Sequence, residues 1–288
     1  MQSKLSNKKL FLLTCKDYPL GNIALQGLLE RLNTFCEAKF CVWQEVQSLK
    51  LNENYIILPL AVWDYTLFYE EFLAFLKECE KSGAKSFNPY ELLRINSKKT
   101  YLKILENKGF KVPKSLFLKE NQKELWQEQI LKFKKDFKLK ELIIKPLVGQ
   151  SGRGVLKFEN LEELNLKEFK EALVQEFITQ AFDGEFCLIF FDNKFSHAIC
   201  RKPPKNEYRA NSAYGVEILP FLPSKELIKK GLKALQVFDF KSLYARVDFL
   251  KNENKFVINE IEFIEPSLYF NFEENSYKNF IKALENLS

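Results

Sequence analysis

The chain has 288 residues, 46% of them hydrophobic, and its 44 Lys and Arg exceed its 38 Asp and Glu by a formal net charge of +6. This length and apolar content are enough to bury two or three packed cores, which excludes a disordered chain. The charge excess is too small to indicate a polyanionic partner, so nucleic acid is not expected.

Histidine and cysteine usage restricts the metal chemistry. The six cysteines include no C-x-x-C pair and His197 is the single histidine, so neither a zinc cluster nor a Cys/His nucleophile is favoured. We predict that His197 is a hydrogen-bonded core residue. The longest uncharged run of note, Tyr55–Trp63, spans nine residues, whereas a membrane span needs roughly 20. A soluble, cytoplasmic protein with reduced thiols and no membrane contact is therefore expected.

The N-terminal third of the chain alternates between strand-like and helix-like patterns. Strands are predicted at residues 9–15, 39–43 and 54–60, and amphipathic helices at 24–35 and 70–79. Such alternation favours a parallel sheet with helices on its faces. The turn residues Phe87-Asn88-Pro89 that follow predict a domain boundary near residue 92.

The middle of the chain predicts two helices and a β-hairpin. The helices are expected at 97–107 and 121–138, and the strands at 141–146 and 156–158. The second helix is expected to be amphipathic, with an apolar face formed by Leu125, Trp126, Ile130, Leu131 and Phe133. The lysine-rich run 132–140 is interpreted as a solvated face, with contact to a nucleic-acid backbone as the less favoured alternative.

A glycine-rich turn joins the two strands of this hairpin. Its members of interest are Lys145, Gly149, Ser151, Gly152 and Gly154. Such a turn can bring backbone N–H groups against phosphate while the lysine supplies positive charge. The β-like residues after it exclude a Walker loop or a dinucleotide fingerprint. A strand–loop–strand clasp over phosphates is the functional interpretation, and a plain hairpin fits this segment alone equally well.

Two strands near the C-terminus carry three carboxylates. Strands are predicted at 186–191, 197–201, 244–250 and 256–263. Glu260 and Glu262 project from one face of the last strand, and Asp248 can oppose them if the last two strands pair. Such a cluster matches the oxygen ligands that Mg²⁺ prefers. Without other motifs, an exposed strand face neutralised by Lys255 or Arg246 is the simpler interpretation.

Several short motifs, in this order, carry a resemblance to a known family. They are Trp63-Asp64-Tyr65, Asn88-Pro89, Asn96-Ser-Lys-Lys-Thr-Tyr101-Leu102, Gly184-Glu185, Ser196-His197-Ala198, Arg209 and Glu260-Ile-Glu-Phe-Ile-Glu-Pro-Ser-Leu268. Over most of its length the chain resembles the carboxylate–amine ligases of the ATP-grasp superfamily, similar to bacterial glutathione synthetase and the ribosomal-protein glutamate ligase. It resembles more closely the branch that contains the cycloserine-forming cyclo-ligase.

The resemblance implies an α/β (α+β) ATP-grasp fold in three parts. Residues 1–92 would form an N-terminal parallel-sheet pre-ATP-grasp domain. Residues 93–178 would form the central ATP-grasp subdomain with the glycine-rich loop, and residues 179–288 the C-terminal subdomain with the metal site.

The resemblance also implies roles at a nucleotide site. The implied binding residues are Lys99, Lys145, Gly149, Ser151, Gly152, Gly154, Gln175, Glu176, Ile178 and Glu185. The two lysines would flank the triphosphate, residues 175–178 would form the hinge at the adenine edge, and Glu185 would bind ribose. Lys98 competes with Lys99, which we prefer because it stands two residues before the aromatic Tyr101.

Metal and substrate roles follow from the same resemblance. Asp248, Glu260 and Glu262 would hold the metal, with Glu262 in place of the family's usual asparagine. Arg201, Arg209 and Asn211 would hold the substrate carboxylate and the reacting phosphoryl group. Cys187 stands where glutathione synthetase-like members carry an arginine, and Val216 follows Gly215 in place of a second glycine, so the substrate cannot be inferred.

The implied activity is a ligase that uses ATP with Mg²⁺ or Mn²⁺. It would convert a substrate carboxylate to an acyl phosphate, which an amine attacks to form an amide or peptide-like bond. The expected partners are small carboxylates and amines, such as amino acids or peptides. The alternatives are a small-molecule phosphotransferase with the same clasp and a non-catalytic nucleotide-binding module. The glycine-rich loop is the expected cover of the site, because water would hydrolyse the acyl phosphate.

Overall fold

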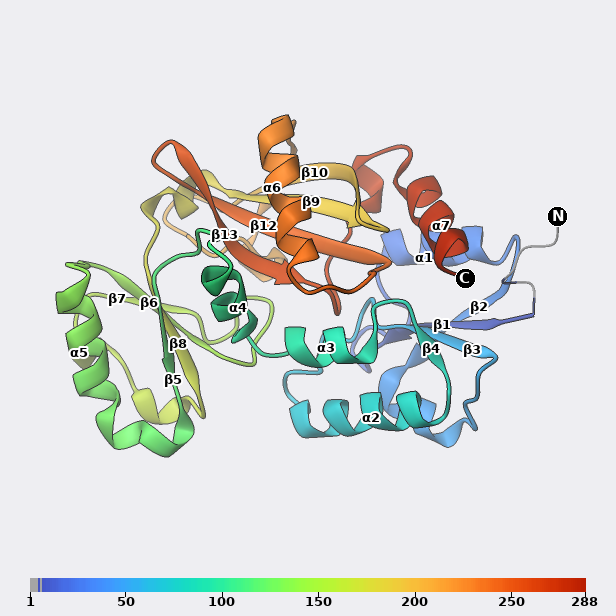
Figure 1. Cartoon of the computed structure of the whole chain (residues 1–288), viewed down its shortest axis with the longest axis horizontal. Coiled ribbons are helices and arrows are strands. Elements are labelled where there is room, and N and C mark those ends of the chain that lie inside the picture. The colour runs from blue at the N-terminus through green and yellow to red at the C-terminus, as the bar shows by residue number, and fades with distance from the viewer. Residues whose placement is uncertain (1–4, 6) are drawn as a thin grey trace.

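The computed structural model describes residue 5 and residues 7–288, which form three β-sheets with helices packed against them (Figure 1). The mixed α/β architecture predicted from the sequence is confirmed. No helix of the described residues is both long and apolar enough to cross a membrane.

The first sheet is parallel, as its alternating sequence predicts. Its strand order is β2 (Glu37–Val42), β1 (Lys9–Thr14), β3 (Tyr55–Leu58) and β4 (Lys85–Ser86). The helices of this region are α1 (Ile23–Leu32) and α2 (Tyr69–Lys81). Successive residues of β1 point to opposite faces, so Leu12 joins one buried core and Leu13 another. The apolar run in β1 is explained by burial on both faces.

The second sheet contains the predicted glycine-rich hairpin. Its order is β5 (Ser115–Leu118), β8 (Ala172–Glu176), β6 (Leu142–Pro146) and β7 (Leu156–Phe158), and all its pairs are antiparallel. Helix α5 (Trp126–Asp136) covers one face of it by inserting Trp126, Ile130 and Phe133 into a separate core.

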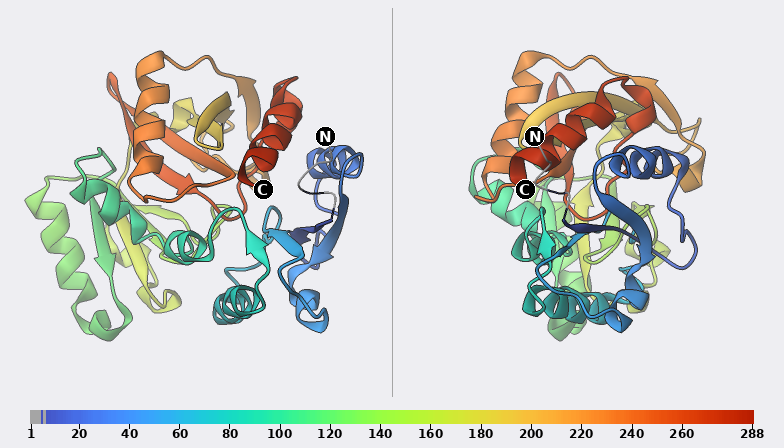
Figure 2. Two further views of the ribbon diagram at one scale, coloured as in Figure 1. Left: turned by 45° about the vertical axis from the view of Figure 1, so that its right-hand side comes forward. Right: turned by 90° about the vertical axis from the view of Figure 1, so that its right-hand side faces the viewer.

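The third sheet is antiparallel and lies above the other two in Figure 1. Its order is β11 (Glu217–Pro220), β10 (Lys194–Lys202), β9 (Glu185–Phe191), β12 (Tyr244–Asn252) and β13 (Lys255–Glu262). Helix α6 (Lys225–Gln236) packs across this sheet. Helix α7 (Ser276–Leu287) returns to lie beside α1, as Figure 2 shows, and places Phe280 in a core shared with the first sheet.

Two predicted helices differ from the structure. The helix expected at 97–107 is α4 (Tyr101–Asn107), and a separate helix, α3 (Tyr90–Asn96), precedes it. The two helices do not form one continuous helix, because the backbone N–H of Lys99 donates to the carbonyl of Leu147, 2.8 Å away, instead of to a carbonyl of the preceding helical turn. The helix expected at 121–138 begins at Trp126, after a 3-10 helix at Glu120–Leu125.

The buried face predicted for that second helix is partly wrong. Leu125 and Leu131 are 42% and 56% exposed. Leu125 lies before the α-helix begins, so the helical period does not apply to it. The side chains that α5 does bury in the core beneath it are Trp126, Ile130 and Phe133.

The three-part division of the chain stays a proposal. Residue 92 falls within α3, whose Leu92 packs in the core of the third sheet while Leu93 packs in the core with α2. Residue 178 follows β8 and precedes the 3-10 helix at Thr179–Asp183.

Candidate functional site

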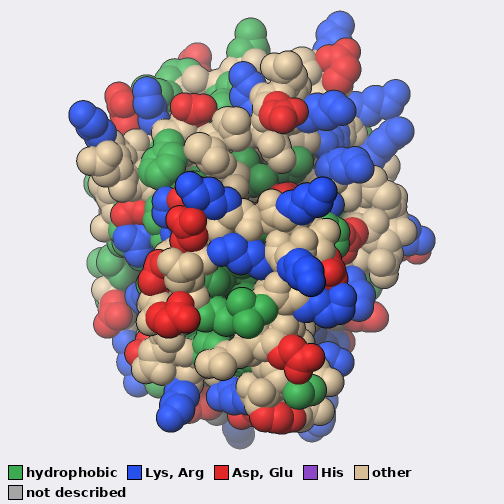
Figure 3. All heavy atoms as spheres, turned by 90° about the vertical axis from the view of Figure 1, so that its left-hand side faces the viewer, with side chains coloured by type: hydrophobic (Ala, Val, Ile, Leu, Met, Phe, Trp, Pro, Cys, Tyr) green, Lys and Arg blue, Asp and Glu red, His purple; other side chains and the backbone are tan. Residues whose placement is uncertain are grey.

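A cavity between the second and third sheets collects the predicted site residues. All sixteen of them line it except Gly154 and Asp248. Asp248 is completely buried, and a Cβ added to Gly154 would lie 3.0 Å from the Pro146 ring. Figure 3 shows the end of the molecule formed by the second sheet, where Lys and Arg side chains gather across the middle of the face.

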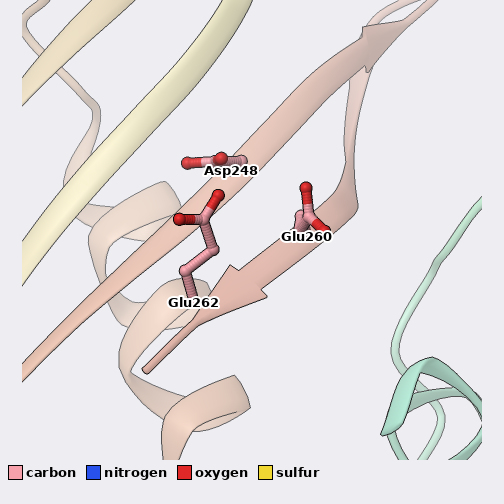
Figure 4. A group of neighbouring side chains, drawn as sticks. All are labelled: Asp248, Glu260 and Glu262. Atoms are coloured by element: carbon pink, nitrogen blue, oxygen red, sulfur yellow. The ribbon is translucent and has the colours of Figure 1, made fainter. Parts of the chain in front are cut away.

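Three carboxylates meet at one wall of this cavity. Strands β12 and β13 pair antiparallel with Asp248 opposite Glu260, as the sequence predicts, and the register shifts beyond them so that Asn259 is left without a partner in the ladder. Asp248, Glu260 and Glu262 each offer an oxygen within 4.8 Å of the others, and Figure 4 shows the three side chains turned toward a common space. This donor set fits a hard divalent cation.

Buried cations surround the three carboxylates. Arg246 donates to both oxygens of Asp248, at 2.8 and 2.9 Å, and also to Glu262. Arg201 donates to Asp248 at 2.8 Å and to Glu185 at 2.5 Å. The alternative interpretation, an exposed strand face, is therefore excluded, because Asp248 has no exposed surface. The part of it that assigns Arg246 as a counter-ion is correct.

The carboxylates differ in their pKa values because their neighbours differ. Burial acts to raise the pKa of Asp248, but Arg246 and Arg201 bring it below its ordinary value. Burial raises the pKa of Glu262 to about 7 despite Arg246, because Asp248 and Glu260 add like charge. A cation bound among the three would remove this repulsion.

The two predicted phosphate lysines have different surroundings. Lys99 forms an ion pair with Glu260, whereas neighbouring Lys98 pairs with Glu171 and does not line the cavity. Lys145 is buried, and its ammonium group forms no ion pair or hydrogen bond with any described residue. Burial, together with the charge of Lys99, lowers the pKa of Lys145 to about 8. A buried cation without a partner is suited to an anionic ligand.

The glycine-rich loop closes over the cavity. Ser151 and Gly152 have positive φ angles of 55° and 71°, and the carbonyl of Gly152 accepts a hydrogen bond from Tyr214 Oη at 3.1 Å. The Gln150 side chain donates to the carbonyl of Trp63 in the first domain. The loop thus touches both the segment around Tyr214 and the N-terminal region.

The predicted hinge and ribose residues lie at one end of the cavity. Gln175 donates to Ser115 Oγ at 2.8 Å, and the Glu176 carboxylate accepts from the Lys114 backbone N–H at 2.9 Å. The Glu185 carboxylate accepts from Arg201 and Asn259. Ile178 is buried among the cavity-lining residues.

The predicted substrate residues lie under the loop. Arg209 pairs with Glu207 at 2.7 Å, and its guanidinium carbon lies 3.8 Å above the centre of the Tyr214 ring. The Asn211 side chain lies beside Gly152. Arg201 keeps a buried Nε–H that has no hydrogen-bond partner among the described residues.

One carboxylate of the cavity, Glu265, was not assigned a role from the sequence. Glu265 lies in a quoted motif but received no role, yet it is 9% exposed and lines the cavity with Tyr65. Asp64 serves the core, where it accepts from Trp43 at 2.7 Å and Gln44 at 2.8 Å. His197 is buried and hydrogen-bonded to the carbonyl of Leu268, so its predicted structural role is confirmed.

Comparison with known proteins defines the class. Residues 10–88 match the family model "D-cycloserine synthetase DcsG, N-terminal domain", and residues 119–225 match "Prokaryotic glutathione synthetase, ATP-grasp domain". The resemblance to the ATP-grasp superfamily is confirmed at the level of the fold: the chain has an ATP-grasp fold, and the segment before it matches the family model of the D-cycloserine synthetase N-terminal domain.

Particular relatives share the fold at low sequence identity. The crystal structure of D-cycloserine synthetase superposes with a TM-score of 0.82 at 21% identity, over 97% of this chain and 100% of that one. D-alanine–D-alanine ligase from Bacillus anthracis gives 0.66 at 16% identity, over 97% and 96%. Glutathione synthetase of Synechocystis sp. is 33% identical over 86 residues, which are 27% of this chain and 27% of that protein. The match therefore spans about a quarter of this curated relative.

Proposed function

We propose that the chain is an ATP-dependent carboxylate–amine ligase that works with Mg²⁺ or Mn²⁺. The observation that carries this proposal is the meeting of Glu260, Glu262 and the buried Lys145 in one cavity that the glycine-rich loop also lines, with buried Asp248 offering an oxygen within 4.8 Å of those of the two glutamates. Opposite charges that face an empty space suit a polyphosphate held with a divalent cation.

The fold supports the same proposal. Solved relatives include D-alanine–D-alanine ligase complexed with ATP, and the ATP-grasp ligase PsnB complexed with Mg and ADP, at TM-scores of 0.65 and 0.67. Asp248, Glu260 and Glu262 would hold the metal. A bound Mg²⁺ would neutralise phosphate oxygens and help to orient them for transfer.

Each group of protein residues has a task in this reaction. Lys99 and Lys145 would stabilise negative charge on the phosphates, and the free Nε–H of Arg201 would donate to the phosphoryl group or the substrate carboxylate. Transfer of the γ-phosphoryl group to the carboxylate gives an acyl phosphate and ADP. The amine then attacks the acyl carbon and phosphate leaves, so no protein nucleophile is required.

The loop would protect this intermediate from water. Gln150 and Gly152 hold the loop against the N-terminal region and the Tyr214 segment. A closed site in which water is excluded favours attack by the amine over hydrolysis. Arg209 and Asn211, which lie beneath the loop, would orient the substrate there.

The first prediction tests this function directly. ADP release should be screened across amino acids and small carboxylates, each with and without an amine. Release that requires both partners is expected, and Glu260→Gln should lose most of it, by about 100-fold or more, because a metal ligand is removed. ATP affinity with and without Mg²⁺ should be measured by calorimetry on the same variant, in which the gain from Mg²⁺ should disappear.

A matched control is Glu106→Gln, which removes one charge from the exposed face of α4. It should retain wild-type activity. Undiminished activity in Glu260→Gln would contradict the metal assignment, and a stable phosphorylated product formed without any amine would favour a phosphotransferase.

A further inference from the structure

A second cavity adjoins the first and differs from it in charge. It has a volume of about 480 Å³ and lies between the start of α1 and the segment from Pro266 to Phe272. Among the described residues that line it there is no Asp, Glu, Lys or Arg, whereas the first cavity is lined by many of each sign. Its volume is in the range of small-molecule sites.

The two cavities share a wall. Glu265 lines the first cavity and the next residue, Pro266, lines the second. Trp63 lines the second cavity, and its indole N–H donates to the backbone carbonyl of Glu265 at 3.3 Å. Asn211 and Ser212 divide between the cavities in the same way. Glu265 in the first cavity is therefore separated from the second cavity by a single step along the chain.

Glu265 is the glutamate of the first cavity that accepts no hydrogen bond from another described residue. Glu176, Glu185, Glu260 and Glu262 each accept a hydrogen bond from another residue. No described Lys, Arg or His pairs with the Glu265 carboxylate, which is 9% exposed and accepts from its own backbone N–H. Burial, with the like charges of Glu262 and Glu260, holds the pKa of Glu265 well above its ordinary value. A buried carboxylate without a counter-ion is costly, and a ligand cation would remove that cost.

Aromatic side chains supply the other half of the site. Tyr18 meets Trp63 edge-on, with ring centres 5.3 Å apart, and both line the second cavity. Tyr18 is 54% exposed and Ile23, at the start of α1, is 78% exposed. The nearby guanidinium of Arg246 is engaged with the Ser267 carbonyl, at 3.3 Å, and with Asp248, and it does not line this cavity. Apolar surface of this kind suits an uncharged aromatic or aliphatic group.

We propose that Glu265 binds the ammonium group of the amine substrate and that the second cavity holds its uncharged apolar body. The proposal rests on the ligase function above and specifies its amine: a primary amine with a hydrophobic substituent. An amine whose body carries a second charge would have no counter-ion in this cavity, so the site would discriminate against it.

The test uses phenethylamine, with phenethyl alcohol as its neutral analogue and ethylamine as the amine without a large apolar body. Affinities are measured by calorimetry on the full chain. The wild type is expected to bind phenethylamine at least tenfold more tightly than either analogue. Glu265→Gln, an isosteric change, should abolish the preference over the alcohol, and Glu106→Gln should retain it.

A second variant tests the apolar cavity. Tyr18→Ala should weaken phenethylamine several-fold and leave ethylamine unchanged, while Leu222→Ala, which removes a 95% exposed side chain elsewhere, should change neither. Absence of phenethylamine binding to the wild type, or a full preference for the amine in Glu265→Gln, would overturn the inference. ATP affinity is measured in parallel. If the wild type does not bind ATP, the ligase proposal is contradicted instead.

Discussion

At the scale of single residues, unmatched charges distinguish the site from the rest of the molecule. Lys145 is a buried lysine and Glu265 a buried carboxyl group, and neither forms an ion pair with any described residue. Most other buried charges are paired, as in the contacts of Arg201 and Arg246 with Asp248. Because an unpaired buried charge is unfavourable, these two residues indicate where ligands of opposite charge bind.

The pKa of Lys145 leads to a prediction about pH. Burial and Lys99 lower it to about 8, although Glu260 and Glu185 act in the opposite direction. Phosphate favours the charged lysine, so ATP binding near pH 8 should take up a proton, and ATP affinity should fall as the pH rises through about 8. Calorimetry in two buffers of different ionisation enthalpy measures this uptake.

Lys145→Arg provides the control for that prediction, since a guanidinium stays charged throughout this range. Its ATP affinity should not fall between pH 7 and pH 9. A wild-type affinity that is constant over the same range would contradict the assignment of Lys145 to phosphate.

At the scale of elements, the glycine-rich loop depends on one close approach. A Cβ on Gly152 would lie 2.8 Å from Asn211 Oδ1 and from a ring carbon of Tyr214, and the φ angle there is +71°. We predict that Gly152→Ala displaces the loop and slows ADP release by about tenfold or more, since small misplacements at a reacting site are costly. ADP-release rates and ATP affinity should both be measured.

Gly109→Ala is the matched control for backbone strain. Gly109 has a φ angle of +83° and nothing within 4 Å of the added methyl group. It should lose about 1–2 kcal/mol of stability from the left-handed backbone and keep its activity. If both alanine variants are equally active, the contact of the loop with Asn211 and Tyr214 does not matter to the reaction.

At the scale of the whole molecule, Asn88 joins segments that are far apart in the chain. It is 1% exposed, and its amide donates to the carbonyls of Tyr244 and Phe263 at 2.9 and 2.6 Å, while its oxygen accepts from the Leu243 N–H at 2.8 Å. We predict that Asn88→Ala lowers the free energy of unfolding by roughly 2–3 kcal/mol, because buried backbone groups lose their partners. Urea denaturation measures this loss.

Asn88→Asp refines the test, because it keeps the acceptor and removes the donor, and it should also destabilise the chain. Asn121→Ala, at an exposed position, should change stability by less than about 0.5 kcal/mol. If Asn88→Ala changes the free energy of unfolding by no more than Asn121→Ala does, the packing of these segments against each other does not depend on the Asn88 side chain.

The sequence alone determined the elements whose cause is local. Alternating apolar residues identified the strands, and the short turn between residues 250 and 256 brought Asp248 opposite Glu260. The strand, turn and return strand around Gly149 could likewise be predicted, because hairpin partners are close in the chain. The order of the short motifs along the chain indicated a family resemblance, and that resemblance supplied the roles expected for the site residues.

Only the tertiary structure decided which charges remain unpaired. Asn96 bonds to the backbone at Ile261 and Phe263, and Trp63 to Glu265, so these contacts join residues more than 160 positions apart. A contact of the same kind, from the Lys99 N–H to the Leu147 carbonyl, delays the helix predicted at 97–107 until Tyr101, and the Trp63 contact lies where Glu265 of the first cavity adjoins Pro266 of the second. No local pattern contains such information, because a side chain's partner, burial and pKa depend on segments brought together only by folding.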